Sequence, residues 1–269
     1  MTMGGALRFE KYEGLGNDFV VVEATRDDAI TSARAAEICD RRHGIGADGV
    51  LLVLPSRDLA SVARMKVINA DGSVPEMCGN GLRCVALHVA RSRGLAAAEL
   101  AFDTDAGSRP CTVHDANGAG LVTVDMGIVS VLGARSIDVG GEMVDVEVAD
   151  AGNPHAISFG DFPRSRVESL GPRIATHASF PHGTNAEFAR VDDGAIDLVV
   201  WERGVGITLA CGTGACATVA VACARNLARY DHVVSVRLPG GALDVTIHRT
   251  TGRAIMRGPA RRVFGGTLY

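Results

Sequence analysis

Short apolar runs separated by glycine turns dominate the first part of the chain and predict β-strands. Such runs lie on both sides of a turn at residues 14–18. They recur as "GVLLVLP" at residues 49–55 and as "RMKVIN" at residues 64–69. The first half therefore reads as a strand-rich region.

Two helical patterns lie among these strands. The first predicts a helix within residues 31–44, which Thr31 or Ser32 can cap and Gly44 can end. The second occupies residues 81–94 and is amphipathic. Its apolar residues at positions i, i+3, i+4 and i+7 are Leu82, Val85, Ala86 and Val89.

The same order of elements returns in the second half of the chain. Strand-like runs enclose a Gly-Asn turn within residues 144–159. Residues 168–180 predict a helix and a loop, broken near Pro172. A second Cys-Gly turn opens a helix within residues 211–230. Further strands are predicted at residues 186–191, 196–202, 232–249 and 252–259.

Three landmarks of the first half recur in the second half, 136, 133 and 134 positions later. They are the pairs Asn17 and Asn153, Cys78 and Cys211, and Phe102 and Val236. Glycine-rich turns can recur by chance. However, three landmarks in the same order favour a duplicated domain, and two copies are too few for a solenoid.

We therefore expect an α/β (α+β) fold of two pseudo-symmetric domains, each a barrel-like, mostly antiparallel sheet around a central helix. The segment "ACATVAVACA" is apolar almost all round, so protein must surround that helix. The expected domains are residues 1–122 with 259–269, carrying Cys78, and residues 123–258, carrying Cys211. The C-terminal "RRVFGGTLY" has no counterpart at the end of the first half, and we expect it to cross back onto the first domain as an extra strand.

Composition narrows the class of protein. The chain has 269 residues, of which 47% are hydrophobic and 22% charged, as in a globular protein. Its net charge of −4, with no basic stripe, argues against a nucleic-acid partner. No apolar run approaches the roughly 18 residues of a membrane span, and the N-terminal sequence lacks a secretory signal pattern. Seven cysteines are an odd number, so we expect reduced thiols in a cytoplasmic protein with no membrane partner.

Two of these cysteines, Cys78 and Cys211, precede a Gly-x-Gly turn at the start of a predicted helix. Free N–H groups there attract anions and stabilise a thiolate, so we expect the cysteine pKa to fall below its free value of about 8.5. A two-fold relation between the halves would bring the thiols face to face. An amino-acid α-carboxylate on the N–H groups would then let one thiolate remove the α-proton while the other thiol protonates the opposite face.

Other chemistries have less support in the sequence. Pyridoxal phosphate needs a Schiff-base lysine, and the only lysines, Lys11 and Lys66, lie in strand-like segments. Neither a CxxC pair nor an HExxH motif indicates a metal site, and neither turn has the GxxxxGK[ST] phosphate motif. We expect a small-molecule amino-acid substrate and neither cofactor nor metal. Inert buried thiols, and a non-catalytic protein that binds an anion or an amino acid, remain as alternatives.

The chain resembles the diaminopimelate epimerase family in motifs that cover nearly its whole length. They are "EKYEGLGNDFVVVE", "HGIGADGVLL", "NADGSVPEMCGNGLRC", "AGNPHA", "FPHGTNAEF" and "WERGVGITLACGTGACA". The resemblance implies two pseudo-symmetric barrel-like domains and cofactor-independent conversion of LL-diaminopimelate to meso-diaminopimelate. It further implies a place in lysine and peptidoglycan precursor biosynthesis, and it is compatible with a homodimer.

The resemblance also implies the roles of individual residues. Cys78 and Cys211 match the two catalytic bases, and His155 and Glu202 match groups that activate the thiols, Glu202 being a substrate contact as well. Asn17 matches a substrate contact near the reacting centre. The N–H donors for the reacting carboxylate are Gly79, Asn80, Gly212 and Thr213. The contacts to the distal end of the substrate are Asn69, Asn153, Asn185 and Arg203.

Each of these residues also has a purely structural interpretation. The asparagines can be turn residues, the histidine can be a satisfied structural group, and the Glu-Arg pair can be a solvated ion pair. One position departs from the family pattern, because Ile207 stands where many members carry glutamate in "GETLACG". This substitution removes a polar group near the second cysteine. It keeps a racemase for another amino acid as an alternative.

Overall fold

The computed structural model describes residues 6–118 and 120–269, and it places seventeen strands and four helices in them. Residues 1–5 and 119, which belong to the first expected domain, lie outside the described residues. In the described part of the chain, no helix has the length and apolar character that a membrane crossing requires.

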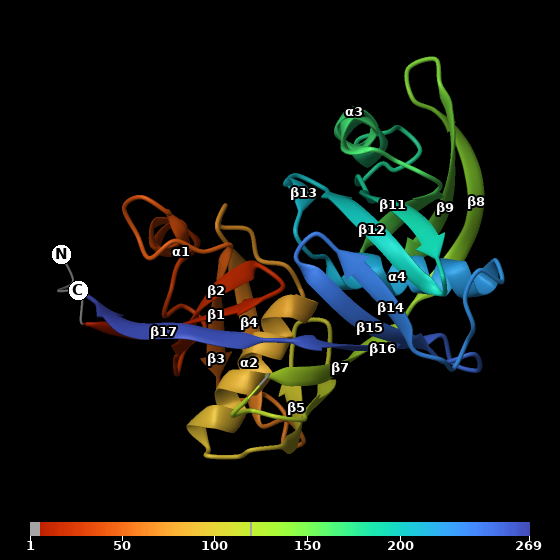
Figure 1. The fold of residues 1–269 in the computed structure, drawn as a ribbon. Coiled ribbons are helices and arrows are strands. Elements are labelled where there is room, and N and C mark those ends of the chain that lie inside the picture. Colours follow the sequence, from red (N-terminus) through yellow and green to blue (C-terminus); the bar gives the residue numbers. More distant parts are fainter. Residues whose placement is uncertain (1–5, 119) are drawn as a thin grey trace. The chain divides into compact units, whose positions relative to one another are not determined.

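The chain divides into two compact units (Figure 1). Unit 1 comprises Met1–Val124 and Gly258–Tyr269, and unit 2 comprises Asp125–Arg257. The backbone passes from unit 1 to unit 2 within β7 (Leu121–Ile128) and returns within β16 (Arg253–Pro259). Cys78 and Cys211 therefore belong to different units, and each unit is described separately.

Unit 1 consists of strands with two helices. Besides parts of β7 and β16, its strands are β1 (Leu7–Gly14), β2 (Asn17–Glu23), β3 (Gly49–Leu54), β4 (Ala63–Asn69), β5 (Ala98–Asp103), β6 (Arg109–Val113) and β17 (Arg261–Leu268). Its helices are α1 (Ser32–Cys39) and α2 (Gly79–Ser92).

Unit 2 has the same kind of construction. Besides parts of β7 and β16, its strands are β8 (Ser130–Asp138), β9 (Met143–Asp150), β10 (Pro154–Phe159), β11 (Asn185–Asp192), β12 (Ala195–Glu202), β13 (Gly206–Thr208), β14 (Val234–Leu238) and β15 (Gly241–Ile247). Its helices are α3 (Arg164–Ala175) and α4 (Gly212–Ala224).

Strand pairing repeats from one unit to the other. In unit 1, β1–β2, β3–β4 and β5–β6 are antiparallel, while β2–β3 and β4–β5 are parallel. In unit 2, β9–β10, β11–β12 and β14–β15 are antiparallel, while β10–β11 and β12–β14 are parallel. The predicted fold class of two pseudo-symmetric, mostly antiparallel domains is confirmed.

The C-terminal strand crosses back as expected, since β17 pairs antiparallel with β1. The expectation that it lacks a counterpart is wrong. Strand β8 directly follows β7 and pairs antiparallel with β9, just as β17 directly follows β16 and pairs with β1. The sequence of β8 follows the first half of the chain, but the strand pairs with β9 of unit 2, so its correspondence to β17 is not apparent from its position in the sequence.

The described strands form one seventeen-stranded sheet, and the strands of each unit surround one helix of that unit. Helix α2 contacts β1, β2, β3, β4, β6 and β17, and helix α4 contacts β8, β9, β10, β11, β12 and β15 (Figure 1). Nearly all of α4 is buried, as its uniformly apolar sequence predicts. Each central helix therefore fixes the position of the cysteine that precedes it.

Helix α1 begins as predicted, because the Thr31 side chain accepts a hydrogen bond from the Arg34 N–H. It ends earlier than Gly44. Asp40 follows its last residue, and the Gly44 N–H donates to the Asp40 carbonyl in a separate turn.

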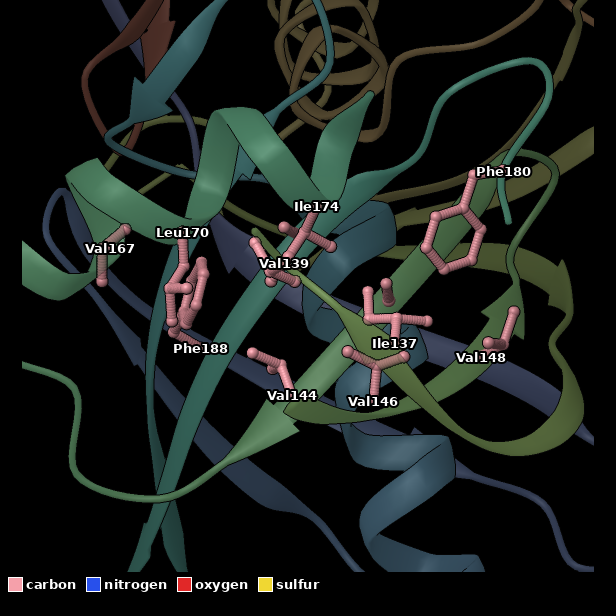
Figure 2. Packing of buried hydrophobic residues seen from close by; sticks show 12 residues of the cluster. Ile137, Val139, Val144, Val146, Val148, Val167, Leu170, Ile174, Phe180 and Phe188 are labelled. Atoms are coloured by element: carbon pink, nitrogen blue, oxygen red, sulfur yellow. The ribbon is translucent and has the colours of Figure 1, made fainter. Parts of the chain in front are cut away.

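Helix α3 packs on the opposite face of β11 from α4. Figure 2 shows its apolar side chains, Val167, Leu170 and Ile174, directed at strand residues of unit 2. The predicted break at Pro172 is wrong, because the helix continues to Ala175. Pro172 removes only the bond to the Glu168 carbonyl, and Glu168 lies on the exposed face while the buried face holds the helix in place.

Candidate active site

The first cysteine turn begins α2. Cys78 is the N-cap residue with an extended backbone, and its Sγ accepts a hydrogen bond from the Gly81 N–H at 3.4 Å. Serine, threonine, asparagine or aspartate usually fills this role. A sulfur atom in this position faces the N–H groups at the start of the helix, where negative charge is stabilised.

An asparagine chain adjoins this turn. The Asn80 amide in the first turn of α2 donates to Asn17 Oδ1 at 3.2 Å, and the Asn17 amide donates to Asp48 Oδ2 at 2.8 Å. Arg41 pairs with Asp48 at 2.8 Å and with Asp18 at 2.7 Å. Two predicted site residues, Asn17 and Asn80, thus lie together beside Cys78 and Gly79, and an ion-pair cluster holds the Asn17 amide in one orientation.

Asn69 lies at the end of β4 and takes part in the following turn. Its side-chain amide donates to Ser73 Oγ at 2.9 Å, and its backbone N–H donates to the Ser73 carbonyl. These contacts are those of a turn residue. Neither contact joins Asn69 to the Cys78 turn.

The second cysteine turn repeats the first. Cys211 is the N-cap of α4, again with an extended backbone, and its Sγ accepts from the Gly214 N–H at 3.4 Å. The Thr213 hydroxyl lies 3.5 Å from the same sulfur. Cys211, Gly212 and Thr213 are therefore brought together as predicted, and the sulfur is buried.

The expected direction of the pKa shift is wrong for Cys211. Burial raises the pKa of this thiol well above its ordinary value, and the carboxylates of Glu202 and Glu187 raise it further. The hydrogen bonds from Thr213 and Gly214 lower it but do not prevail. The thiol is therefore protonated at neutral pH, which suits it to donate a proton.

Glu202 lies at the end of β12 beside this thiol. Its carboxylate accepts a hydrogen bond from the Thr208 hydroxyl at 2.7 Å, and its charge raises the pKa of the Cys211 thiol. Burial raises the pKa of the Glu202 carboxyl, and the negative charge of Glu187 adds to that effect. Glu202 therefore acts electrostatically on the cysteine that the sequence predicts it to assist.

His155 is fully buried and is held at both ring nitrogens. Nδ1 lies 2.6 Å from Glu187 Oε1, and Nε2 lies 2.9 Å from Asn153 Oδ1. Glu187 can only accept when it is ionised, so the ring donates from Nδ1 to that carboxylate. These contacts join His155 to Asn153 as predicted, whereas its link to Cys211 runs through Glu187.

Asn185 and Arg203 also lie together. Asn185 Oδ1 accepts a hydrogen bond from the Arg203 backbone N–H at 2.9 Å. The Arg203 guanidinium donates to the His182 carbonyl and is exposed. Within the described residues the Arg203 guanidinium bonds the His182 carbonyl and the Glu202 carboxylate bonds Thr208, so the surface ion-pair interpretation has no support.

Glu187 was not among the predicted site residues. It is fully buried on β11, and it contributes to the raised pKa values of both Cys211 and Glu202. Its signal in the sequence is an acidic residue between the apolar residues Ala186 and Phe188 of the predicted strand "AEFARV". A charged residue inside a buried strand requires a partner, and His155 is that partner.

Ile207 packs against the hydrophobic cluster under α3. In the β12–β13 pairing it lies opposite Trp201, while the next residue, Thr208, bonds Glu202. The isoleucine therefore faces apolar neighbours, and the polar contact to Glu202 comes from Thr208.

The two lysines have partners within unit 1. Lys11 is buried and pairs with Asp18 at 2.5 Å, and Lys66 donates to the Asp27 carbonyl at 3.0 Å. Among residues 6–118 and 120–269, no group of three histidine, cysteine or acidic side chains is arranged to hold a metal ion.

Comparison with known sequences gives one consistent family. The model of the family described as diaminopimelate epimerase matches residues 9–132 and 148–263. "Diaminopimelate epimerase 1" from a Nostoc species is 41% identical and covers 98% of this chain and 100% of its own. "Diaminopimelate epimerase" from a Synechocystis species is 40% identical over 97% of this chain and 98% of its own.

Solved structures with the same fold are more distant in sequence. A probable proline racemase from Agrobacterium radiobacter superimposes with a TM-score of 0.78 at 17% identity, covering 98% of this chain and 93% of its own. A hydroxyproline epimerase from Agrobacterium vitis gives a TM-score of 0.74 at 18% identity, covering 100% of this chain and 94% of its own. These likenesses establish the fold.

Proposed function

Since the chain belongs to the diaminopimelate epimerase family and is an isomerase, we propose that it epimerises LL-diaminopimelate to meso-diaminopimelate without a cofactor, through Cys78 and Cys211. The observation that carries this proposal is the duplicated turn. In each unit a cysteine sulfur caps the central helix and accepts the N–H of the third helical residue at 3.4 Å.

The proposed chemistry is one proton removal and one proton delivery. One sulfur, as thiolate, takes the α-proton when the Cα–H bond breaks. The other sulfur, as thiol, gives its proton to the opposite face of the same carbon. The raised pKa of Cys211 supports a resting state in which Cys211 is the thiol, and we assign the role of the base to Cys78.

We propose that backbone N–H groups at the starts of α2 and α4 bind the reacting carboxylate. The residues concerned are Gly79, Asn80, Gly212 and Thr213. Negative charge grows on this carboxylate as the α-proton leaves, and helix N-termini stabilise such charge. The hydrogen bond between Asn80 and Asn17 supports a role for Asn17 beside the reacting centre.

For the distal end of the substrate, we propose contacts from Asn69, Asn153, Asn185 and Arg203. The support is strongest for Arg203, whose exposed guanidinium can hold a carboxylate and whose backbone is fixed by Asn185. His155 and Glu202 are proposed to set the protonation of Cys211, and Glu202 also to contact the substrate.

The product would serve lysine and peptidoglycan precursor synthesis. We also propose a cytoplasmic homodimer. All seven cysteines are free thiols, as in a reducing compartment. Strand β17 exposes Val263 and Phe264, which together could bury apolar surface against a second copy. Light scattering that gives the mass of a single chain at micromolar concentration would contradict the dimer.

The activity is tested with purified protein, diaminopimelate stereoisomers and a panel of other amino acids, analysed by chiral chromatography. We expect turnover of LL- and meso-diaminopimelate and loss of at least about 100-fold in kcat for Cys78→Ala or Cys211→Ala. The matched controls are Cys84→Ala and Cys216→Ala, buried cysteines one and a half turns along the same two helices. Turnover of another amino acid with diaminopimelate inert would refute the proposed substrate.

A further inference from the structure

The strand register allows the two cysteine turns to be compared position by position. Phe19 on β2 pairs with Gly49 at the start of β3, and these two strands run parallel to each other. His155 on β10 pairs with Asn185 at the start of β11 in the same parallel arrangement. His155 in unit 2 therefore occupies the place that Phe19 occupies in unit 1.

Two residues further along, Glu187 on β11 corresponds to Leu51 on β3. The packing against the helices gives the same equivalence independently. A Cβ placed on Gly81 would lie 2.9 Å from Leu51 Cδ2, and a Cβ placed on Gly214 would lie 3.0 Å from Glu187 Oε1. Each of these side chains therefore packs against the third helical residue of its cysteine turn.

The two turns thus share a backbone and differ in what lies beneath them. The first has Phe19 and Leu51, both buried and apolar. The second has His155 and Glu187, both fully buried and 2.6 Å apart. A buried ion pair is no better for stability than well-packed apolar residues, so its presence under only one turn points to a use in that turn.

Only one oxygen of the Glu187 carboxylate is hydrogen-bonded to His155. Oε1 bonds His155, while Oε2 has no hydrogen-bond partner among the described residues. The same Oε1 lies beside the place where a Gly214 side chain would be, and Cys211 Sγ lies 3.3 Å from that place. The carboxylate therefore faces the sulfur across a residue that has no side chain.

We propose that Glu187 is a positioning residue that keeps Cys211 protonated in the free enzyme, and that the Leu51 position makes the first turn electrostatically different. The negative charge of Glu187 opposes a second negative charge on the sulfur, and His155 holds that carboxylate in place. The titratable groups that face Glu187 are His155 from β10, Glu202 from β12 and Cys211 itself.

The effect of Glu187 on the ionisation of Cys211 does not depend on the proposed function. Its consequence for catalysis rests on the proposed function. In catalysis it makes Cys211 the proton donor of the resting enzyme and leaves Cys78 as the base. With Glu187 neutral, Cys211 ionises more readily while Cys78 is unchanged, and the thiol that must deliver the proton is lost at lower pH.

The test is the rate at which iodoacetamide alkylates Cys211 in the substrate-free protein, followed by peptide mass spectrometry across pH 7–10. We expect Glu187→Gln to alkylate Cys211 about ten-fold faster at pH 9, since removal of a neighbouring charge lowers a pKa by about one unit or more. Alkylation of Cys78 in the same samples should not change. Glu147→Gln on β9, whose carboxylate pairs with Arg225, is the matched control and should leave Cys211 unaffected.

Glu187→Leu is measured in parallel, because unit 1 accommodates leucine at the equivalent position. It should accelerate alkylation of Cys211 as the glutamine variant does. An unchanged rate in whichever of these variants is folded would overturn the proposal. So would an equal acceleration at Cys78, which would indicate general loosening.

A second measurement separates this proposal from the proposed function. The alkaline limb of kcat/KM for epimerisation should move to lower pH in Glu187→Gln, because the donor thiol ionises earlier. Faster alkylation of Cys211 in a protein that never epimerises diaminopimelate would contradict the proposed function and support the role of Glu187. A faster alkylation with an unmoved alkaline limb would refute the catalytic part of the assignment.

Discussion

The buried pair of His155 and Glu187 makes a quantitative prediction about stability. Both side chains are fully buried, so solvent does not screen their interaction. Replacing His155 by phenylalanine leaves the buried Glu187 without its hydrogen-bond partner, and such a carboxylate takes up a proton on folding. At pH 8, protonating a group with an ordinary pKa of about 4.3 costs about 5 kcal/mol, and at pH 6 it costs about 2 kcal/mol.

We therefore expect His155→Phe to lower the free energy of unfolding by about 3–5 kcal/mol at pH 8 and by less at pH 6. The sign follows from proton binding. In the variant the folded state holds a proton on Glu187 that the unfolded state has lost, so stability falls as pH rises. The double variant His155→Phe/Glu187→Leu, which reproduces the residues of unit 1, should be within about 1 kcal/mol of the original protein.

The assay is denaturant unfolding followed by fluorescence of Trp201, the single tryptophan, which lies in unit 2. Arg164→Ala, which removes an exposed ion pair with Glu168 on α3, is the control and should cost less than about 1 kcal/mol. The reasoning is refuted if the single variant costs under 1 kcal/mol at pH 8, or if the two substitutions add without coupling.

Three further predictions concern single groups. Glu202→Gln should raise the free energy of unfolding at pH 8 by about 1 kcal/mol, because the raised pKa of this carboxyl means that its ionised form opposes folding. The same variant should lower kcat about ten-fold or more, and a loss of stability in denaturant unfolding would contradict the prediction. Asp48→Asn should lower kcat/KM about ten-fold by releasing the Asn17 amide, as measured by steady-state kinetics beside the surface control Asp28→Asn. The free energy of unfolding should fall between about pH 9 and pH 11, because burial raises the pKa of Cys39 to about 11 and the thiol of the unfolded chain ionises at lower pH. Thermal scans across this pH range should show a smaller fall for Cys39→Ala, and an unchanged slope would contradict the prediction.

Much of the fold follows from periodicity and from internal repetition. Cys78 and Cys211 are 133 positions apart because they occupy the same place in the two halves. Each is the N-cap residue of the central helix of its unit. The uniformly apolar α4 is buried because no face of it can meet water. Local signals suffice where one residue type has one physical role, as at the Thr31 cap.

Other features depend on tertiary packing and escape local reasoning. Pro172 was expected to break a helix, but the buried contacts of Leu170 and Ile174 outweigh one lost backbone hydrogen bond. The helix N-terminus was expected to lower the pKa of Cys211. Its effect is worth about 0.3–1 kcal/mol, less than the burial of the sulfur beside two carboxylates.

The local pattern marks Glu187 only as an acidic residue between apolar ones and does not indicate its role. Its alternating position in β11 is ordinary for a strand residue, and only the buried histidine on the neighbouring strand gives it a role. The offset of 136 positions that relates Asn17 to Asn153 also relates Phe19 to His155 and Leu51 to Glu187. Comparing the two halves residue by residue would have marked both polar substitutions as the point where the second half departs from the first.

The central claim is that two thiols act on one α-carbon, and early-time isotope exchange tests it most directly. LL-diaminopimelate is turned over in D2O to less than one tenth of equilibrium, and both stereoisomers are then separated and weighed by mass spectrometry. The account predicts one deuterium at the inverted carbon of the meso product and almost none in the remaining LL substrate, because the donor thiol exchanges with solvent and the acceptor does not return its proton to the same face. Product without deuterium, or full epimerisation by Cys78→Ala or Cys211→Ala, would contradict it.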